Sequence, residues 1–498
     1  MNYMGVDVGT SGCKAVVFNE GGEQIASAYR EYDLIISSDG GAELDSDNVM
    51  EQCFVVMREA AGAAGEPVRG IGISSQGEAF TAVDGDGHAL SNGMVTSDVR
   101  SAPYVAEFPA AFGEERLYQI TGHTSHTMFT LFKLLWLKHN RPEVWTNARK
   151  FLCMEDLLQF HLGLDPTISW SLAGRTMMFD VRKHEWSPEI LSTAGVRTDQ
   201  LARPMASGKI AGHLDKKITD DLGLEPDAFV VVGGHDQVAG ALGGGATESG
   251  IGMYATGTTE CITAAFAQPV FTDDMRNGNL CTYDHAVEGL YATLAFSLTG
   301  GNILKWFRDE FGALEIAESE RTGVDAYEVL LKSASSEPTS LMVLPYFTPS
   351  GTPHFDMTTA GAILGLRLGT GRGEIIRALL EGVALEMRLN VDTLERSGCP
   401  VQQLRAIGGG AKSTFWVQLK ADVIGKPITI LNITEAACLG MAMLACAADN
   451  GVLLADLTSE WVKSAETIHP QSDIAAAYDR KFEAYKKLHP AIRDIALA

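Results

Sequence analysis

A strand, a short loop of glycine and hydroxyl residues, and a second strand occur together twice in this sequence, once in each half. The first copy reads GVDVGTSG at residues 5–12, and the second reads GMYATGTTE at residues 252–260. In each copy a mostly apolar run predicts a strand that ends at Gly-Thr, where the chain turns back. The match is short, but its occurrence in both halves favours an internally duplicated chain.

Strands and helices alternate along both halves. A β-hairpin is expected from residue 4, then a helix that Asp45 or Ser46 caps and that runs to about residue 64. Further strands are predicted at 68–74, 79–83, 229–232, 341–347, 404–407 and 428–431, and further helices within 110–165, from about 302, at 372–397 and from about 434. This alternation indicates an α/β architecture with mostly buried sheets. Because no long Pro/Ser-rich linker separates the halves, we expect them to pack around a shared cleft.

The charge balance excludes two classes of partner. The chain has 39 Lys and Arg against 63 Asp and Glu in 498 residues, a formal net charge of −24. Nucleic-acid binding needs clustered Lys and Arg to meet phosphate, and a membrane surface needs a polybasic run. We therefore expect neither nucleic acid nor a membrane as a partner.

Cysteine usage and the first residues predict a cytoplasmic location. The eight cysteines form no CxxC motif, which favours free thiols in a large chain of a reducing compartment. The first ten residues contain Asp7 and no basic segment, so a secretory signal is not expected. The longest apolar run, 436–448, is too short to span a bilayer and predicts a buried helix. The twelve histidines form neither HExxH nor a Cys/His cluster, so a zinc enzyme is not supported.

Glycine-rich turns follow four apolar strands, at 9–12, 233–234, 257–259 and 408–410. Glycine lets backbone N–H groups approach phosphate oxygens, and Thr or Ser adds hydroxyl donors. Two duplicated Gly-Thr loops and a GGGAKS turn therefore suggest a nucleotide held from both halves. A Walker loop is excluded, because Ala406 and Ala411 occupy its two glycine positions. The first turn reads GTSGCK and also fails the dinucleotide-binding pattern.

Two acids lie beside these turns. Asp7 precedes Gly9 by two residues and could hold Mg²⁺, directly or through water, or could be a structural cap of the turn. Asp236 follows two glycines and starts a predicted helix, where it is either a helix cap or a general base. The segment DGDG at 84–87 lacks the remaining ligands of a calcium loop, which favours a plain turn.

Five segments carry a resemblance to a known family. They read MGVDVGTSGCKAVVFNEGG, GGHDQVAGALGGG, YATGTTE, TGGNILKWFRD and IGGGAKSTFWVQLKADVIGKPI. In order and spacing they resemble the FGGY family of carbohydrate kinases over nearly the whole chain, and most closely its xylulose-kinase branch. The resemblance implies two actin-like domains of ribonuclease-H type with a cleft between them, a sugar-binding one at 1–247 and a nucleotide-binding one at 248–498. It also implies ATP and Mg²⁺ as cofactors, and it makes a homodimer one option for assembly.

The same resemblance assigns roles to residues of this sequence. Asp7 matches the magnesium-organising aspartate, Asp236 the general base, and Gln237 the neighbour that contacts substrate. The positions that match nucleotide-binding turns are Gly9, Thr10, Ser11, Lys14, Gly257, Thr258, Gly300, Gly301, Gly410, Ala411 and Ser413.

The sugar side departs from the family pattern. Xylulose kinases have a GQMHG-like stretch where this chain has Ser-Gln-Gly-Glu-Ala at 75–79, and Gly77 stands where glycerol kinases have arginine. The candidate substrate residues are Gln76, Gly77, Glu78, Asp98, Asp236 and Gln237. Asp98 and Arg100 could equally form an ordinary ion pair, and Arg175 could be a buried ion-pair partner or could meet an acidic sugar. His123 and His126 are expected in core or surface roles.

These observations predict ATP-dependent phosphorylation of a hydroxyl of a small sugar or polyol, with a ketopentose such as xylulose as the first candidate. The alternative is an actin-like ATPase or nucleotide-binding protein without sugar kinase activity, which the Gly-Thr loops alone would allow. The His-Asp-Gln triplet at 235–237 argues against that alternative, because a plain ATPase needs no base that faces a sugar.

Overall fold

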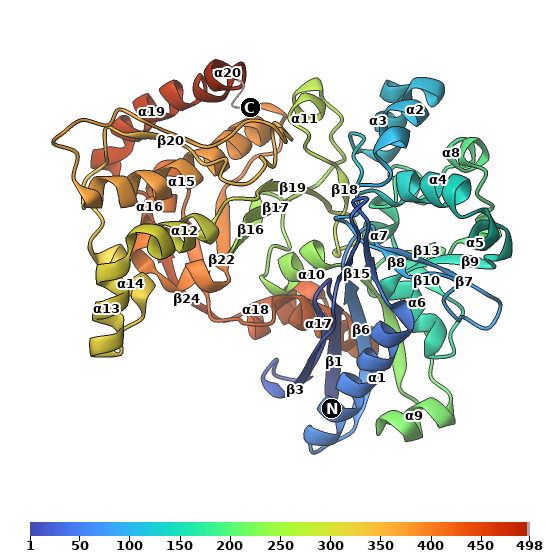
Figure 1. Ribbon diagram of the computed structural model, residues 1–498. Coiled ribbons are helices and arrows are strands. Elements are labelled where there is room, and N and C mark those ends of the chain that lie inside the picture. Colours follow the sequence, from blue (N-terminus) through green and yellow to red (C-terminus); the bar gives the residue numbers. More distant parts are fainter. Residues whose placement is uncertain (496–498) are drawn as a thin grey trace.

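A computed structural model describes residues 1–495 and places the two halves of the chain in two lobes, each built on its own central sheet (Figure 1). The first half, blue to green in Figure 1, surrounds one sheet, and most of the second half, yellow to red, surrounds the other. The predicted α/β architecture is confirmed.

The first sheet joins three antiparallel strands to two parallel ones and ends in an antiparallel edge strand. Its order is β3-β2-β1-β6-β15-β14, with β1 parallel to β6 and β6 parallel to β15. The strands are β1 (Asn2–Val8), β2 (Gly12–Asn19), β3 (Gln24–Glu31), β6 (Val68–Ser75), β14 (Ile210–His213) and β15 (Phe229–His235).

The second sheet repeats this arrangement. Its order is β18-β19-β17-β16-β22-β23-β24, in which β19, β17 and β16 are antiparallel, β22 and β23 are parallel to β16, and β24 is antiparallel. The predicted duplication of the strand-loop-strand unit therefore extends to six strands of each sheet. The strands are β16 (Ile251–Thr256), β17 (Glu260–Phe266), β18 (Tyr283–Asp284), β19 (Tyr291–Ser297), β22 (Gln403–Ile407), β23 (Ile428–Leu431) and β24 (Ser464–Ile468).

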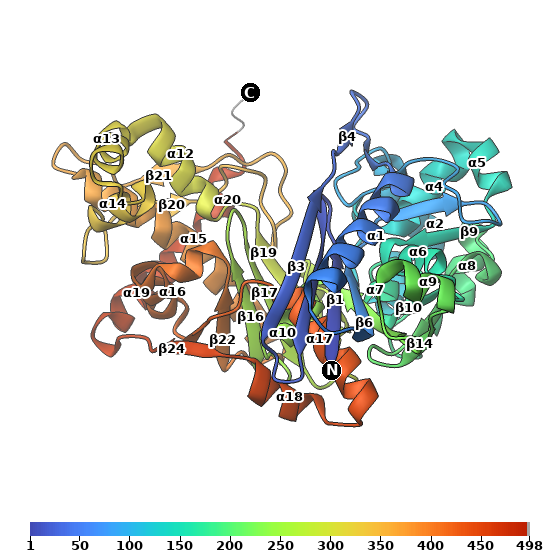
Figure 2. The ribbon, with the colours of Figure 1, turned by 90° about the horizontal axis from the view of Figure 1, so that it is seen from below.

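Two helices connect the lobes. Helix α10 (Asp236–Gly243) leaves the first sheet, and helix α17 (Ala436–Asn450), from the second half, packs across β1 and β6 of the first sheet (Figure 2). Glycines permit this close packing, because a Cβ atom at Gly5 or Gly72 would collide with carbonyl oxygens of α17. The core around the two helices includes side chains from both halves, and Cys438 and Cys446 are buried in it as predicted.

The remainder of the first half forms a five-stranded sheet and a layer of helices. The strand predicted at 79–83 is present as β7 (Phe80–Val83), which pairs along its length with β9 (Lys150–Cys153), while only Val83 pairs with Ala89 across the turn at 84–87. The other strands here are β4 (Ile35–Ile36), β5 (Ala42–Leu44), β8 (Gly93–Met94), β10 (Thr167–Ser169), β11 (Phe179–Asp180), β12 (Glu185–Trp186) and β13 (Arg203–Met205). The helices are α1 (Ser46–Ala63), α2 (Ala102–Phe112), α3 (Glu114–Thr121), α4 (Thr130–Asn140), α5 (Pro142–Asn147), α6 (Met154–His161), α7 (Trp170–Gly174), α8 (Pro188–Ala194), η1 (Thr198–Gln200) and α9 (Lys216–Leu222).

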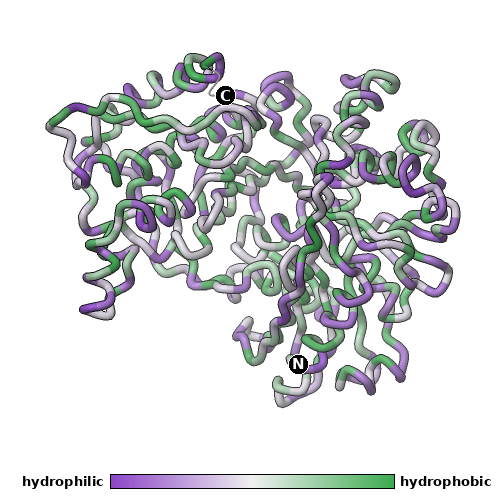
Figure 3. The backbone as a smooth tube through the Cα atoms, in the orientation of Figure 1, coloured by the Kyte–Doolittle hydropathy of each residue, from purple (hydrophilic) through white to green (hydrophobic). Residues whose placement is uncertain are grey.

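The second half adds helices around its sheet and a small strand pair. The strand predicted at 341–347 is shorter than expected, since β20 covers only Met342–Leu344 and pairs with β21 (Ala362–Leu364). The outer helices carry both hydrophobic and hydrophilic residues, as expected for helices with one face on a core (Figure 3). The elements are α11 (Asp273–Asn277), α12 (Gly301–Phe311), α13 (Ala313–Thr322), α14 (Ala326–Lys332), α15 (Arg372–Arg396), η2 (Gly409–Lys412), α16 (Thr414–Ile424), α18 (Leu454–Trp461), α19 (Ser472–Tyr485) and α20 (Leu488–Ile492).

One of the four predicted glycine turns, at 233–234, is part of a strand instead. Gly233 and Gly234 do not form a turn after the strand but belong to β15, which continues to His235. The register against β6 shifts there, and the Gly233 N–H donates to Glu155 Oε1 (2.8 Å) instead. Gly233 leaves no space for a Cβ atom, because Ile73 of β6 lies directly against it. The two glycines thus form a bulge that carries the strand to Asp236.

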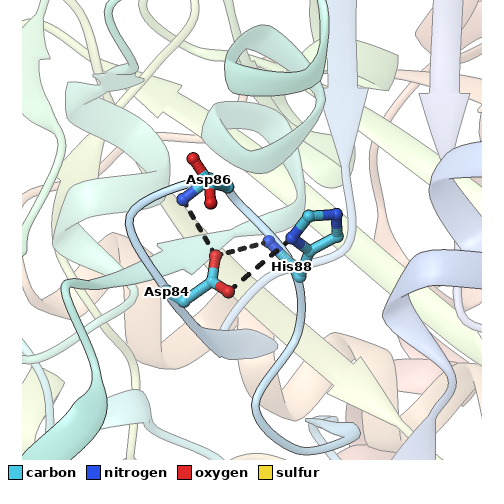
Figure 4. A group of neighbouring side chains, drawn as sticks. All are labelled: Asp84, Asp86 and His88. Carbon is cyan, nitrogen blue, oxygen red and sulfur yellow. Dashed lines mark hydrogen bonds and ion pairs between the residues drawn. The ribbon is translucent and has the colours of Figure 1, made fainter.

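The segment at 84–87 is a turn, as expected. Asp84 Oδ1 accepts hydrogen bonds from the backbone N–H groups of Asp86 and His88, and the three side chains lie close together (Figure 4). These bonds are those of an Asp-stabilised turn. All eight cysteines have free thiols, and no helix in residues 1–495 is long and apolar enough to cross a membrane.

Candidate active site

The carboxyl ends of β1, β6 and β15 meet at one edge of the first sheet and bring Asp7, Ser74 and His235 together. Asp7 pairs in register with Ser74 of β6, and the Ser74 hydroxyl donates to Asp7 Oδ1 (2.8 Å). Burial raises the pKa of Asp7 above its usual value, while Ser74 and the nearby Lys14 oppose that shift. Ligands of α/β proteins bind at this edge of a sheet.

The first glycine-rich loop is fixed by a buried glutamine. Gln76 Nε2 donates to the Gly9 carbonyl (3.0 Å), and Gln76 Oε1 accepts from the Thr10 hydroxyl (3.0 Å). Both polar groups of Gln76, a predicted substrate residue, therefore face the loop. Ser11 is exposed at its tip. The ammonium group of Lys14, predicted beside phosphate, pairs with Glu435 (2.8 Å), the residue that precedes α17.

Asp236 and Gln237 follow at the start of α10, and their side chains are partly exposed. Burial raises the pKa of Asp236 to about 8, and the negative charges of Asp7 and Glu78 add to the shift. Asp236 Oδ1 and Gln237 Oε1 are enclosed by protein but accept no hydrogen bond from any described residue. His235 Nε2 lies 3.0 Å from Asp236 Oδ1 without hydrogen-bond alignment, and burial keeps the pKa of His235 far below its usual value. Buried polar atoms without a partner are uncommon in native proteins, and a bound ligand is one way in which they become paired.

Glu78 forms a buried ion pair with Arg175. Its backbone has a positive φ of 62°, and Arg175 Nε donates to its Oε1 (2.5 Å) while the Thr96 hydroxyl donates to its Oε2 (2.9 Å). Gly77 is required beside it, because a Cβ atom there would lie 2.7 Å from His235 Nε2 and 3.7 Å from Arg175 Nε. Glu78, Arg175, His235 and Asp236 are thus neighbours. Arg175 was expected to be either a buried ion-pair partner or a contact to an acidic sugar, and the structure shows it as a buried ion-pair partner.

Asp98 lies apart from this group. It is 0% exposed, and Arg100 donates from Nε and Nη2 to its carboxylate (3.1 and 2.5 Å to Oδ2). The backbone N–H of Ala42 also donates to Oδ2 (3.0 Å), and Glu43 is a second partner of Arg100. Asp98 and Arg100 therefore form an ordinary ion pair. Because Asp98 is fully buried, a substrate cannot contact it in this structure.

Three predicted nucleotide-binding turns meet in the second lobe. The Gly301 N–H donates to the Gly257 carbonyl (2.7 Å), and the Asn302 N–H donates to the Thr258 carbonyl (3.2 Å), so that α12 begins against the Gly-Thr loop. Gly300 also lacks space for a Cβ atom beside this loop. Thr258 is exposed and Gly257 half-buried.

The third turn is η2, which contains Gly410 and Ala411. A Cβ atom at Gly410 would collide with the Thr256 hydroxyl at the end of β16, so η2 packs against the second loop. Ala411 is buried. The Ser413 hydroxyl accepts from the Trp416 N–H (3.3 Å) and thereby caps α16. The turns at 257–259, 300–301 and 409–412 thus pack against one another.

A buried charged group beneath these turns was not predicted from the sequence. Lys420 of α16 is 1% exposed and donates to both oxygens of Glu260 (3.0 and 2.8 Å) and to the Thr256 hydroxyl. Its ammonium group also lies 4.1 Å from the centre of the Trp416 ring. Lys420 lies in a mostly apolar helix and Glu260 follows the second Gly-Thr loop, but they are 160 residues apart, so no local signal indicates that they pair. Thr96 was likewise not predicted as a partner of Glu78.

Comparison with known proteins agrees with the two-lobed architecture. Residues 2–243 match the N-terminal domain of the FGGY family of carbohydrate kinases, and residues 252–448 match its C-terminal domain. This chain has the actin-like two-domain fold of that group of enzymes. It belongs to the FGGY family and is a carbohydrate kinase.

The individual relatives have different substrates in their names. The chain is 26% identical to a xylulose kinase of Bacillus subtilis over 503 residues, covering 100% of this chain and 99% of that protein. It is 27% identical to a gluconokinase of the same organism over 484 residues, covering 96% and 93%. It is 30% identical to an autoinducer-2 kinase of an Enterobacter species over 468 residues, covering 89% and 86%. Among solved structures, a xyloylose kinase from Brucella ovis superposes with a TM-score of 0.90 at 26% identity, covering 99% and 100%.

Proposed function

We propose that this kinase transfers the γ-phosphoryl group of ATP to a hydroxyl of a small sugar or polyol, with a ketopentose such as xylulose as the first candidate. In this proposal the sugar binds the domain at 1–247 and the nucleotide binds the domain at 248–498. The observation that carries the proposal is the pair of enclosed, unpaired oxygens of Asp236 and Gln237 at the start of α10. Because both side chains are partly exposed, they could turn toward a bound substrate, whose hydroxyl groups would supply the missing donors.

Asp236 is the proposed general base. Phosphoryl transfer needs in-line positioning, charge neutralisation and a group that accepts the proton of the attacking hydroxyl. The raised pKa of Asp236, about 8, makes it a stronger proton acceptor than an ordinary aspartate, once it is ionised. The partly exposed side chain can reach a bound sugar, which the fully buried Asp98 cannot.

Asp7 is the proposed residue that organises Mg²⁺. Ser74 donates to only one of its oxygens, and the nearby ammonium group of Lys14 is paired with Glu435 instead. The other oxygen is therefore free to meet the ion directly or through water, which suits the preference of Mg²⁺ for oxygen ligands. When bound, Mg²⁺ would neutralise charge on the phosphates of the nucleotide.

The nucleotide is assigned to the joined turns of the second lobe and to the first Gly-Thr loop. Backbone N–H groups at glycines can approach phosphate oxygens, and the hydroxyls of Thr10, Ser11 and Thr258 add donors. Gly9 and Gly257 are half-buried, so both loops are accessible.

Sugar-dependent ADP release tests the proposal. The purified enzyme with MgATP would be offered ketopentoses, tetritols, glycerol and aldonates, and Asp236→Asn would be assayed in parallel. We expect ADP release only with a sugar or polyol, and a loss of about 10²–10⁴-fold in kcat for Asp236→Asn. ATP hydrolysis at the same rate with and without every sugar would contradict the proposal and favour the ATPase alternative. A fully active Asp236→Asn enzyme would contradict the general-base role, because Asn cannot accept the proton. The helix-cap role expected as the alternative is not what the structure shows, since His235 is the N-cap of α10 and no side chain among residues 1–495 caps that helix.

A further inference from the structure

The cations near Glu78 are all engaged by protein partners. Arg100 is paired with Asp98 and Glu43. Lys133 of α4 is 0% exposed and donates to the Val95 carbonyl (3.0 Å). Neither side chain can therefore reach a bound sugar.

Arg175 is engaged on every side of its guanidinium group. Besides Glu78, its Nη1 contacts His123 Nε2 (3.2 Å), and its Nη2 contacts Met128 Sδ (3.5 Å). The rings of Phe129 and Tyr283 lie 5.1 and 5.6 Å from its Cζ atom. The side chain is 7% exposed. Arg175 therefore presents no free donor face to solvent while Glu78 remains charged.

The groups that stay accessible here are acidic or neutral. Asp236 is 32% exposed, and Asp7 is half-buried at the same sheet edge. Burial lowers the pKa of His126, His123 and His235, so these three rings are neutral near pH 7. A carboxylate of a sugar acid would enter this region beside the carboxylate of Asp236 and would meet no free cation among residues 1–495.

We propose, on the basis of the sugar kinase function above, that the Arg175–Glu78 ion pair determines substrate charge: it restricts the enzyme to uncharged sugars and excludes sugar acids. Glu78 neutralises the one arginine that borders His235 and Asp236. The chain is similar to both a xylulose kinase and a gluconokinase, so similarity alone does not indicate whether its substrate is neutral or acidic. The Arg175–Glu78 ion pair favours a neutral substrate. Arg175 acts through Glu78 and is a positioning residue.

Removing the charge of Glu78 should reverse the selectivity. Glu78→Gln keeps the size of the side chain and an acceptor for Thr96, but it leaves the guanidinium of Arg175 without its counter-charge. The freed guanidinium matches a carboxylate in shape and charge. Glu43→Gln is the matched control, because it removes a carboxylate partner of Arg100 without altering Arg175.

The experiment compares kcat/KM for D-xylulose and other neutral sugars with kcat/KM for D-xylonate and D-gluconate. We expect the wild-type enzyme to favour its best neutral substrate by at least about 100-fold, the scale of several kcal/mol for an unmatched like charge. Glu78→Gln should reduce that ratio by about tenfold or more, and Glu43→Gln should leave it unchanged. A purely structural role of the pair would lower both kcat/KM values together and keep their ratio.

Three outcomes would overturn the inference. Equal wild-type rates with aldonates and neutral sugars would overturn it and leave the proposed function intact. An unchanged ratio in folded Glu78→Gln would overturn the role of the pair. ADP release with no sugar at all would overturn the proposed function and this inference with it. A thermal-shift assay of the wild-type protein tests the inference without relying on a folded variant. The best neutral sugar, at about 20-fold its own KM, should raise the Tm of the enzyme, and D-gluconate at the same concentration should not.

Discussion

At the residue scale, Asp236 links the proposed catalysis to stability. Its folded pKa of about 8 lies above the ordinary aspartate value of 3.8, so the folded state binds a proton more tightly than the unfolded state does. The ionised side chain therefore destabilises the fold. This penalty is absent below about pH 4, grows as pH rises, and is complete above about pH 8.

Asp236→Asn should accordingly stabilise the protein most at alkaline pH. Since the side chain is 32% exposed, solvent reduces the penalty, and we expect a gain of about 1–2 kcal/mol at pH 8.5 and a smaller gain at pH 5.5. Calorimetric unfolding of both proteins at the two pH values, without ligands, measures the difference. A gain that is equal at both values, or larger at pH 5.5, would refute the pKa shift.

Some residues of the site could be identified from the sequence, whereas the partners of others could not. Asp7 and Asp236 lie at the ends of apolar strands beside glycines, and a local pattern is enough to single them out. The partner of Glu78 is Arg175, 97 positions away, and the sequence left its role open between an ion pair and a substrate contact. The Lys420–Glu260 pair was missed for the same reason. A buried ion pair is defined by tertiary packing, which leaves no periodic signal in either segment.

At the element scale, the crossing of α10 and α17 depends on glycine. A Cβ atom at Gly440 of α17 would collide with the Ala239 carbonyl and approach the Gly243 N–H of α10 to 2.9 Å. These are backbone atoms of a packed helix and cannot move independently. The sequence predicted the apolar helix from about residue 434, but it could not show that this helix crosses to the first sheet.

Gly440→Ala should destabilise the protein by about 1–3 kcal/mol, because overpacking displaces the two helices. Gly62→Ala is the matched control in α1, where nothing lies within 4 Å of the added atom. That substitution should stabilise by about 0.5–1 kcal/mol through helix propensity. Denaturant unfolding of both variants gives the comparison, and effects of the same sign would contradict the packing argument.

The Lys420–Glu260 pair joins α16 to the start of β17 beneath the turns that we propose bind the nucleotide. Lys420→Met would leave Glu260 buried and unpaired, which should cost about 3–5 kcal/mol. The same change should raise KM for ATP more than KM for sugar, since Thr256 and the second Gly-Thr loop lose a partner. Steady-state kinetics and denaturant unfolding measure both effects.

The double variant Lys420→Met/Glu260→Gln tests whether the cause is the unpaired charge. Because it leaves no buried charge, it should recover most of the lost stability. If the double variant is as unstable as the single one, the role of Lys420 is packing against Trp416 and Tyr254 instead.

At the scale of the whole molecule, the site combines groups from two similar sheets that share one core. The first Gly-Thr loop and Asp236 belong to the first lobe, and the joined turns at 257–259, 300–301 and 409–412 belong to the second. The α10–α17 core holds the lobes together at their centre. At the periphery the contacts are weaker, as in the exposed ion pair between Arg276 and Glu115.

Ligands that contact both lobes should therefore draw them together and exclude water from the reacting phosphate. We expect a smaller radius of gyration by small-angle X-ray scattering with a saturating sugar and a non-hydrolysable ATP analogue than without ligand. In the proposed function the sugar binds the first lobe, so the sugar alone should produce less compaction than the pair of ligands. Asp236→Asn should still compact, because it removes a proton acceptor and leaves the rest of the binding surface intact. Identical profiles for free and doubly liganded enzyme at saturation would show that the lobes do not close. In that case, closure could not be what protects ATP from hydrolysis in the absence of sugar.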